Sequence, residues 1–235
     1  MTQQLVLFDI DGTLVLTGGA GKRGMTRAFE SLFGIPDAFA AISLAGRTDT
    51  SILADALARH GVLFTPNDIS AFRTRYLDCL REEVAQTAAG KQVLPGVLPL
   101  LSALDTSPQS FLGLLTGNYA EAAEVKLGHF GLWRYFRCGA FGEDAHDRNH
   151  LVPIALDRAR ASGLPFDIDA DRVVVVGDTP RDVACAHAHG ARIVAVATGE
   201  YSAGVLREAG AEVVFDDFLD TPAVLASING GRLLS

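Results

Sequence analysis

The stretch VLFDIDGTLVLTGGAGKRG (residues 6–24) decides how the chain is interpreted, because it joins two different signals. An uninterrupted apolar run leads directly into two aspartates, Asp9 and Asp11. A glycine-rich segment follows and ends in Gly21-Lys22, which is typical of loops that bind phosphate. The first signal predicts a buried strand that carries carboxylates at its carboxyl end, and the second predicts an anion-binding loop.

The glycine-rich segment does not fit the phosphate-binding loop pattern. That pattern, G-x-x-x-x-G-K-[ST], requires glycine at position 16 and serine or threonine at position 23. The chain has Leu16 and Arg23 at these positions. We therefore expect the glycines to form a hinge into the following segment, with Lys22 and Arg23 in its first helix.

Short apolar runs that end in glycine, aspartate or threonine recur along the chain. Their β-branched residues indicate strands, and because the runs are apolar on both faces they indicate parallel strands covered by helices on each side. The expected strands are residues 5–9, 111–117, 173–178, 193–199 and, more weakly, 212–215.

Helical stretches lie between these runs and stop at glycines suited to the left-handed conformation that ends many helices. The expected helices are residues 119–130, 151–162, 180–189 and 202–209, which stop at Gly131 (or Gly128), Gly163, Gly190 and Gly210. The alternation predicts an α/β fold with a doubly wound, mostly parallel, Rossmann-like sheet.

Residues 17–90 interrupt this alternation with helices alone. The expected helices there are residues 22–33, 49–60, 67–76 and 77–88. A helical block after the first strand predicts an inserted α-helical cap domain over residues 17–90. The core domain is then discontinuous, with residues 1–16 and 91–235.

The composition of the chain limits which partners and which cellular compartment are expected. A net charge of −8 over 235 residues argues against nucleic acid or an anionic membrane as the main partner. No apolar run approaches the ~18 residues of a membrane span, and no targeting segment is evident. Three cysteines without C-x-x-C spacing indicate reduced thiols. We expect a cytoplasmic protein, either a monomer or a homodimer.

Three expected strands end in polar residues. Asp9 and Asp11 follow the first, Thr116 follows the second, and Asp178 follows the third. In open α/β sheets ligands gather at the carboxyl ends of the strands, so these side chains would share one crevice. Clustered carboxylates raise one another's pKa unless a cation lies among them, and a hard ion with oxygen ligands, most simply Mg²⁺, resolves the conflict.

Local structure explains some of these residues without any function. Asp11-Gly12 alone is a common turn. Thr179 fits a helix N-cap and Pro180 the first helical position, which puts Asp182 in the first turn, where the helix dipole favours an anion. This leaves Asp178 unexplained, because it precedes the cap at a strand end.

Taken together, the segments DIDGT (9–13), LLTGN (114–118) and GDTPRD (177–182) resemble the three motifs of the haloacid dehalogenase superfamily of phosphotransferases. The chain resembles the phosphoglycolate-phosphatase-like branch, in which an α-helical cap is inserted after the first strand. The resemblance implies a small phosphorylated metabolite as substrate and Mg²⁺ as cofactor.

The resemblance also implies a role for each motif residue. Asp9 would be the nucleophile that forms an aspartyl-phosphate, and Asp11 the general acid and base. Thr116 and the backbone near Gly117 and Asn118 would bind the phosphoryl oxygens. The metal ligands would be the side chain of Asp9, the backbone carbonyl of Asp11, and Asp178, with Asp182 acting through water or behind the first ligands.

The superfamily adds a cation, usually lysine, before the last acidic motif. Lys126 is a poor candidate because it lies in the middle of an expected helix. Arg148 precedes the expected helix 151–162 and is assigned this role; a guanidinium is always charged and binds phosphate through two donors.

Three questions stay open at this stage. An acid/base carboxylate at Asp11 argues against dehalogenation, and leaves a phosphatase or, as the alternative, a phosphosugar mutase. A non-catalytic phosphoacceptor or binding protein is a further alternative, although the spacing of Asp9 and Asp11 and the helical insert argue against it. Arg47, in the cap segment LAGRTD (44–49), would bind a carboxylate or second phosphate of the substrate, or is a solvated arginine beside a capped helix.

Overall fold

The sheet is built around β1 (Gln4–Phe8), which pairs with a strand on each side. The computed structural model describes residues 3–165 and 168–230. The strand order is β5-β4-β1-β6-β7-β8, and every pairing is parallel. The remaining strands are β4 (Ser110–Leu115), β5 (Cys138–Ala140), β6 (Val173–Gly177), β7 (Arg192–Val196) and β8 (Val213–Phe215). The predicted doubly wound parallel sheet is thus confirmed.

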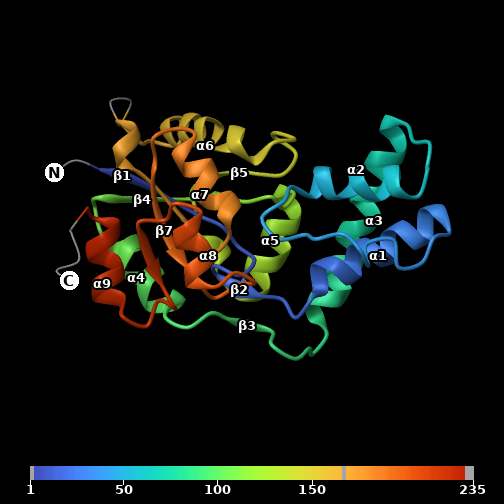
Figure 1. Cartoon of the computed structure of the whole chain (residues 1–235), viewed down its shortest axis with the longest axis horizontal. Coiled ribbons are helices and arrows are strands. Elements are labelled where there is room, and N and C mark those ends of the chain that lie inside the picture. Colours follow the sequence, from blue (N-terminus) through green and yellow to red (C-terminus); the bar gives the residue numbers. More distant parts are fainter. Residues whose placement is uncertain (1–2, 166–167, 231–235) are drawn as a thin grey trace.

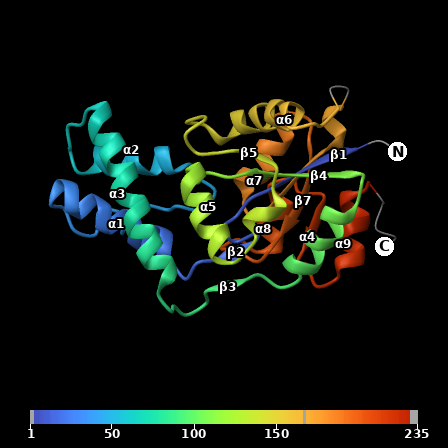
Figure 2. The same cartoon turned by 180° about the vertical axis from the view of Figure 1, so that it is seen from behind.

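Helices cover both faces of this sheet, as Figures 1 and 2 show from opposite sides. Val6 and Phe8 belong to a buried apolar cluster with α4 (Val97–Thr106), α5 (Ala120–His129) and α9 (Thr221–Ile228). Leu5 and Leu7 belong to a second cluster with α6 (Leu151–Ala161), α7 (Pro180–His187) and α8 (Ala203–Glu208). Alternate residues of β1 therefore anchor opposite layers, which explains why its sequence is apolar throughout.

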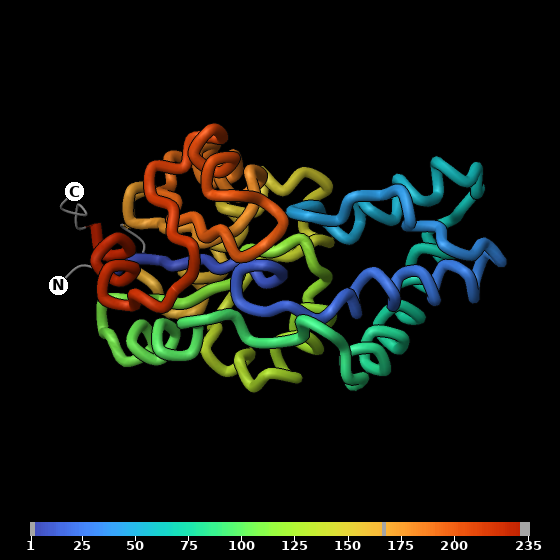
Figure 3. The backbone as a smooth tube through the Cα atoms, turned by 60° about the horizontal axis from the view of Figure 1, so that its bottom comes forward, coloured from blue at the N-terminus to red at the C-terminus, as the bar shows by residue number. Residues whose placement is uncertain are grey.

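A separate helical unit extends from one end of the sheet (Figure 1). It contains α1 (Ala20–Phe33), α2 (Asp49–Arg59) and α3 (Pro66–Ala85), which surround a third apolar cluster. Tyr119 and Ala122 at the start of α5 belong to this cluster, so α5 lies between the sheet and the helical unit. The start of β1 and the end of α9 lie away from the helical unit, as the two ends of the colour scale in Figure 3 show.

Two segments connect the core with the helical unit, and they run side by side (Figure 3). β2 (Val15–Leu16) leads out and pairs antiparallel with β3 (Gln92–Val93), which leads back. Gly18 has φ 61° and lies against Ala88, so a side chain at position 18 would meet the returning segment. Gly18 and Gly19 therefore belong to this double connection.

The predicted elements agree with the structure to within a few residues at most ends, but one pair of predicted helices is a single helix, and several elements, including the two-residue strands β2 and β3, were not predicted. The glycines after α5, α6, α7 and α8 all have positive φ, between 66° and 108°, as expected of helix stops. Residues 66–85 form one helix instead of two, because nothing near Tyr76-Leu77 breaks it. β5, α4 and α9 were not predicted; β5 has only three residues, too few to show a pattern. In the described part of the chain, no helix is long and apolar enough to cross a membrane.

Candidate active site

The predicted site residues meet at the carboxyl ends of the three central strands. β1 lies between β4 and β6, so Asp9, Thr116 and Asp178 follow neighbouring strands. The amide of Asp9 donates to the carbonyl of Val176 at 2.9 Å, which continues the strand pairing to the site. A cavity of about 770 Å³ lies at this edge, between the sheet and the helical unit. Asp9, Asp11, Thr116 and Asp178 all line it.

Three buried carboxylates form the acidic centre of the site. Asp9, Asp178 and Asp182 each offer an oxygen, and these oxygens lie within 4.8 Å of one another. Burial, opposed by Arg148 and reinforced by Asp182 and Asp11, raises the pKa of Asp9 to about 6. Burial and the nearby Asp9 and Asp182 raise the pKa of Asp178 well above its ordinary value. Burial is the largest cause of both shifts, and the neighbouring carboxylates add to it.

Arg148 is the cation inside this cluster. It is buried in the short helix Arg148–His150 and contacts Asp9 at 3.1 Å and Asp182 at 2.5 Å. It also donates to the carbonyl of Leu115 at 2.9 Å. Although burial opposes its charge, Asp182 and Asp9 raise the pKa of Arg148, so the guanidinium remains charged.

Asp182 has a structural task that limits its availability. Its Oδ2 accepts from the amide and the hydroxyl of Thr179, at 3.0 and 2.7 Å, and Oδ1 accepts from Arg148. With Thr179 as N-cap and Pro180 at the first turn, this is a complete capping box of α7. The predicted cap is confirmed. Asp182 therefore fixes Arg148 and the helix start at the same time.

The space that the Asp178 carboxylate occupies is available because residues 12 and 199 are glycines. A Cβ at Gly12 or at Gly199 would overlap this carboxylate, and Gly12 has φ 86°. The hydroxyl of Thr13 donates to Asp178 Oδ1 at 2.7 Å. These contacts bring backbone segments from the ends of β1 and β7 against the carboxylate and fix its direction.

The acidic cluster fits a divalent metal. It offers only carboxylate oxygens, which are the ligands of hard cations such as Mg²⁺, and three carboxylates face a single guanidinium. Asp9 and Asp178 have oxygens not used by the capping box, whereas those of Asp182 are engaged. The backbone carbonyl of Asp11 remains a predicted fourth contributor.

Asp11 projects from the turn after β1 toward the cavity, and its side chain is 43% exposed. Its Oδ2 accepts from the side-chain amide of Asn118 at 2.8 Å. The same amide donates to the hydroxyl of Thr116 at 2.9 Å. Asn118 thus links the segments after β1 and β4, and the three predicted residues form one network.

Gly117 lies directly beneath the helical unit. A Cβ at Gly117 would overlap the backbone carbonyl of Arg47. The carbonyl of Gly117 accepts from the amide of Asp49 at 2.7 Å. The close approach of residues 47–49 to the loop after β4 therefore requires glycine at position 117.

Arg47 lines the cavity but its guanidinium is already engaged. It forms an ion pair with Asp55 at 2.7 Å and donates to the carbonyl of Ser51 at 3.1 Å. Thr48 caps α2 by accepting from the amide of Ser51. The cap of α2 is therefore confirmed, whereas substrate binding by Arg47 stays a prediction.

Lys126 reaches the site, contrary to the expectation that its mid-helix position excludes it. The side chain is 5% exposed, and Nζ lies 2.6 Å from Asp11 Oδ2 and 2.6 Å from Asn118 Oδ1. Sequence reasoning missed it because the tilt of α5, which only the folded structure defines, directs this residue toward the end of β1. Lys126 lies ten residues after Thr116 in the sequence, and this separation matches no helix or strand periodicity that would predict a contact.

Two residues of the helical unit add buried polar groups near Asp11. Asp49 accepts from the amide of Tyr119 at 2.8 Å, and burial raises its pKa to about 7. The hydroxyl of Tyr76 is buried, lines the cavity and has no hydrogen-bond partner among the described residues. Neither was predicted as a site residue.

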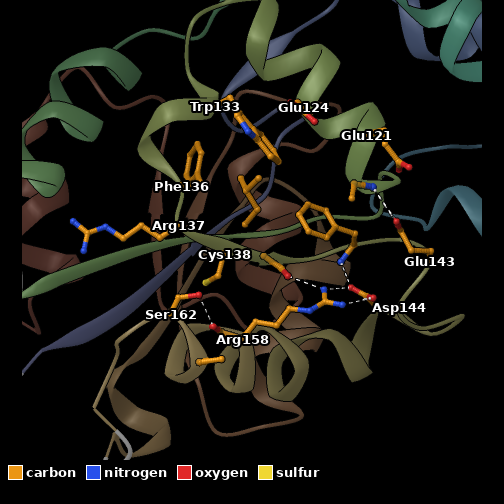
Figure 4. Close-up of a pocket in the computed structure, with 15 residues that line it drawn as sticks. Glu121, Glu124, Trp133, Phe136, Arg137, Cys138, Glu143, Asp144, Arg158 and Ser162 are labelled. Carbon is orange, nitrogen blue, oxygen red and sulfur yellow. Dashed lines mark hydrogen bonds and ion pairs between the residues drawn. The ribbon is translucent and has the colours of Figure 1, made fainter.

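A second hollow, of about 520 Å³, lies beside edge strand β5 and is separate from this site (Figure 4). Trp133, Phe136 and Phe141 line it, together with acidic residues at its rim. Arg158 crosses it to pair with Asp144 (Figure 4). None of the predicted site residues line this hollow.

Comparison with known proteins identifies the family. The family model of haloacid dehalogenase-like hydrolases matches residues 6–196, and the chain belongs to this family. The phosphoglycolate phosphatase of Rhodospirillum rubrum is 33% identical over 216 residues, which cover 91% of this chain and 87% of that protein. Family membership makes the chain a hydrolase, and this relative supports a phosphatase within the family.

Two further proteins are similar over most of this chain. Tyrosine-protein kinase PtkA of Mycobacterium tuberculosis is 29% identical over 90% of this chain and 68% of its own length. The solved structure of a predicted phosphoglycolate phosphatase from Haemophilus somnus has a TM-score of 0.69 at 19% identity, covering 96% of this chain and 99% of that one. At that identity the structural likeness shows the fold alone.

Proposed function

We propose that the protein is a Mg²⁺-dependent phosphatase that hydrolyses a small phosphate monoester, such as phosphoglycolate or a sugar phosphate. The observation that carries the proposal is the meeting of Asp9, Asp11, Thr116 and Asp178 around one cavity at the ends of three adjacent strands. The R. rubrum relative supports the phosphoglycolate assignment by its name.

In the first half of the proposed reaction, a carboxylate oxygen of Asp9 attacks phosphorus. A bond forms between this oxygen and phosphorus while the bond from phosphorus to the ester oxygen breaks. Asp11 gives its proton to the ester oxygen, so that the product leaves as a neutral alcohol. Asp9 then carries the phosphoryl group as an acyl phosphate.

In the second half, Asp11 is a carboxylate and takes a proton from water. The water oxygen attacks phosphorus and the bond to Asp9 breaks, which releases inorganic phosphate and restores the Asp9 carboxylate. The exposed side chain of Asp11 at the cavity suits both proton transfers, whereas buried Asp9 is suited to direct attack.

The remaining residues bind and neutralise the phosphoryl group. The hydroxyl of Thr116 and the backbone amides near Gly117 and Asn118 would donate to its oxygens, and Arg148 would hold Asp9 in position. Mg²⁺ held by Asp9, Asp178 and the Asp11 carbonyl would offset the charge between the anionic nucleophile and the anionic substrate. Asp182 would act from behind by fixing Arg148.

The helical unit would select the substrate. We propose that residues 17–90 act as a cap on the core of residues 1–16 and 91–235, and that Arg47 exchanges its ion pair with Asp55 for an anionic group of the substrate. The three described cysteines are free, which supports a reducing, cytoplasmic compartment.

The proposal is tested by measuring phosphate release from a panel of monoesters with and without Mg²⁺. Phosphoglycolate, hexose phosphates, nucleotides and p-nitrophenyl phosphate cover the relevant leaving groups. We expect metal-dependent release from at least one small ester. Isomerisation of a hexose phosphate without phosphate release would replace the phosphatase by the mutase alternative, and no turnover of any ester would overturn the proposal.

A further inference from the structure

Lys126 is a buried cation, and within residues 3–165 and 168–230 its side-chain hydrogen bonds go to two site residues. An ammonium group excluded from water is costly unless its donors are used. Nζ donates to Asp11 Oδ2 and to Asn118 Oδ1, both at 2.6 Å. These two acceptors come from the segments that follow β1 and β4, so Lys126 joins two strand ends from a helix that belongs to neither.

Asp11 depends on these contacts for its orientation. Asp11 directly precedes the turn at Gly12, and its side chain is 43% exposed, so packing does not fix it. In the described chain, the hydrogen bonds to its carboxylate come from Lys126 and Asn118, and both use Oδ2. Lys126 also donates to Oδ1 of Asn118. This hydrogen bond orients the Asn118 amide group so that its nitrogen points toward Asp11.

The position of Lys126 distinguishes it from the other cation of the site. Arg148 contacts the carboxylates of Asp9 and Asp182 and lies among the acidic cluster. Lys126 contacts Asp11 instead, and two of its three N–H donors are already used by the protein. A side chain at Gly21 would approach Nζ at 3.3 Å, so the start of α1 covers the lysine.

We propose that Lys126 is a positioning residue which, through Asp11 and Asn118, aims the Asp11 carboxyl group at the ester oxygen of the substrate. The inference rests on the proposed phosphatase function. Lys126 keeps its own protons and forms no bond to the substrate; Asp11 alone transfers the proton when the phosphorus–oxygen bond breaks. The loss of Lys126 should therefore impair steps that need this proton more than steps that do not.

The test compares two esters in the full-length protein with Mg²⁺. One is the best alkyl monoester of the panel, whose leaving oxygen needs a proton. The other is p-nitrophenyl phosphate, whose phenolate departs without one. For Lys126→Met we expect kcat/KM for the alkyl ester to fall about 10- to 100-fold, and that for the aryl ester less than about threefold. KM should change little for either ester.

Two further variants keep this test decisive. Lys126→Gln retains an N–H donor without the charge and carries the test if Lys126→Met does not fold, as judged by circular dichroism. We expect it to show the same bias to a smaller extent. Lys91→Met is the matched control, because the Lys91 ammonium donates to the backbone carbonyls of Val84 and Gln86, away from the acidic residues of the site. It should retain the wild-type ratio of the two kcat/KM values.

Equal losses on both esters, or no loss on either, in folded Lys126 variants would overturn the positioning role. Such a result would leave the phosphatase proposal intact, because the wild-type protein would still turn over both esters. A wild-type protein that hydrolyses neither ester would overturn the proposed function and the role of Lys126 together. The two failures are therefore distinguishable.

Discussion

The core and the helical unit bury different kinds of side chain. At the ends of its central strands the core buries Asp9, Asp178, Asp182 and Arg148, whose charges are only partly balanced. The helical unit buries an aromatic cluster of Phe29, Phe39, Phe72 and Tyr76 with ring centroids 5.6 to 6.3 Å apart. The charged residues of the site are held in place by a rigid sheet. The helical unit is stabilised by its own aromatic cluster.

The two regions share the apolar contacts of Tyr119 and Ala122, and they also meet through polar contacts around the start of α2. The amide of Asp49 donates to Gly117, the hydroxyl of Thr50 donates to Gly142 at 2.8 Å, and Thr48 contacts His146. Such contacts are directional and can be exchanged for water, unlike an apolar interface. We therefore propose that the core performs the chemistry, that the helical unit recognises the substrate, and that the contacts at α2 help to couple the two regions.

The largest effect should come from the core nucleophile. Asp9→Asn is expected to lower kcat for any ester by about 10³-fold or more, because an amide oxygen cannot form the acyl phosphate. The midpoint of thermal unfolding at neutral pH should stay at or above that of the wild type, because a buried carboxylate with a pKa raised to about 6 is removed.

Asp105→Asn serves as the matched control for this prediction, because it makes the same change at an exposed position of α4. It should affect neither activity nor stability. Substantial turnover by Asp9→Asn would break the assignment of chemistry to the core.

The next effect concerns pH and the coupling of the two regions. Burial raises the pKa of Asp49 from 3.8 to about 7, so the folded protein binds this proton more tightly than the unfolded chain. The free energy of unfolding should therefore fall as pH rises from about 4 to about 7. The difference corresponds to about 4 kcal/mol at most. Asp49→Asn should flatten this pH dependence and raise stability at pH 8.

Denaturant titrations between pH 4 and 8 provide the measurement, and Asp68 provides the contrast. Asp68 occupies a similar place in the first turn of α3, but it is exposed and hydrogen bonds from Thr65 lower its pKa. The contribution of Asp68 to the free energy of unfolding should be present at neutral pH and should be lost as pH falls. If the stability of Asp49→Asn fell more steeply with rising pH than that of the wild type, this result would contradict the role given to the burial of Asp49.

A smaller effect is expected from the glycine beneath the helical unit. Gly117→Ala would place a Cβ on the carbonyl of Arg47, so residues 47–49 must move away from the loop after β4. We expect a loss of about 1–3 kcal/mol in stability and a fall in kcat/KM of about tenfold. Hydrogen exchange of the amides of Asp49 and Tyr119 should accelerate.

Gly128→Ala is the control for this substitution. Gly128 lies in α5 with no heavy atom within 4 Å of an added Cβ, so alanine should leave activity unchanged and stabilise the helix slightly. If Gly117→Ala behaves like Gly128→Ala, the close contact between the two regions does not matter for function.

The smallest effect should come from Arg47. Arg47→Ala is expected to lower kcat/KM about tenfold for esters with a second anionic group and to leave other esters unchanged, because one charge-assisted hydrogen bond is lost. Arg59→Ala is the control, because Arg59 is an exposed arginine at the end of α2, the helix that follows Arg47. Asp55→Asn should have the opposite sign, because it frees the guanidinium of Arg47. Unchanged selectivity in Arg47→Ala would remove it from the site.

The fold could be predicted where local chemistry determines it. The apolar runs predict the strands because a parallel strand must be apolar on both faces, as Leu5 and Val6 of β1 are. Gly163 and Gly190 mark helix ends because the left-handed conformation costs glycine little. β5 has no such signal: its three residues become a strand only because β4 lies beside them.

The site could be predicted only as far as its motifs are contiguous. Asp9, Asp11, Thr116 and Asp178 each follow a strand, so the topology alone brings them together. Lys126, Asp49 and Tyr76 lie within helices, and their arrival at the cavity depends on the angles at which α5, α2 and α3 pack. Packing angles arise from the whole structure and leave no pattern in a short window of sequence.

The central position of β1 has a consequence for synthesis on the ribosome. β1 is made first, but its two partners are residues 110–115 and 173–177. At roughly 5–20 residues per second, the strand that carries Asp9 waits on the order of ten seconds for its second neighbour. Throughout that interval a segment apolar on both faces has an open edge, while α1–α3 can pack together as soon as α5 supplies Tyr119 and Ala122. A nascent chain that stops before residue 177 would thus contain a finished helical unit attached to an aggregation-prone strand.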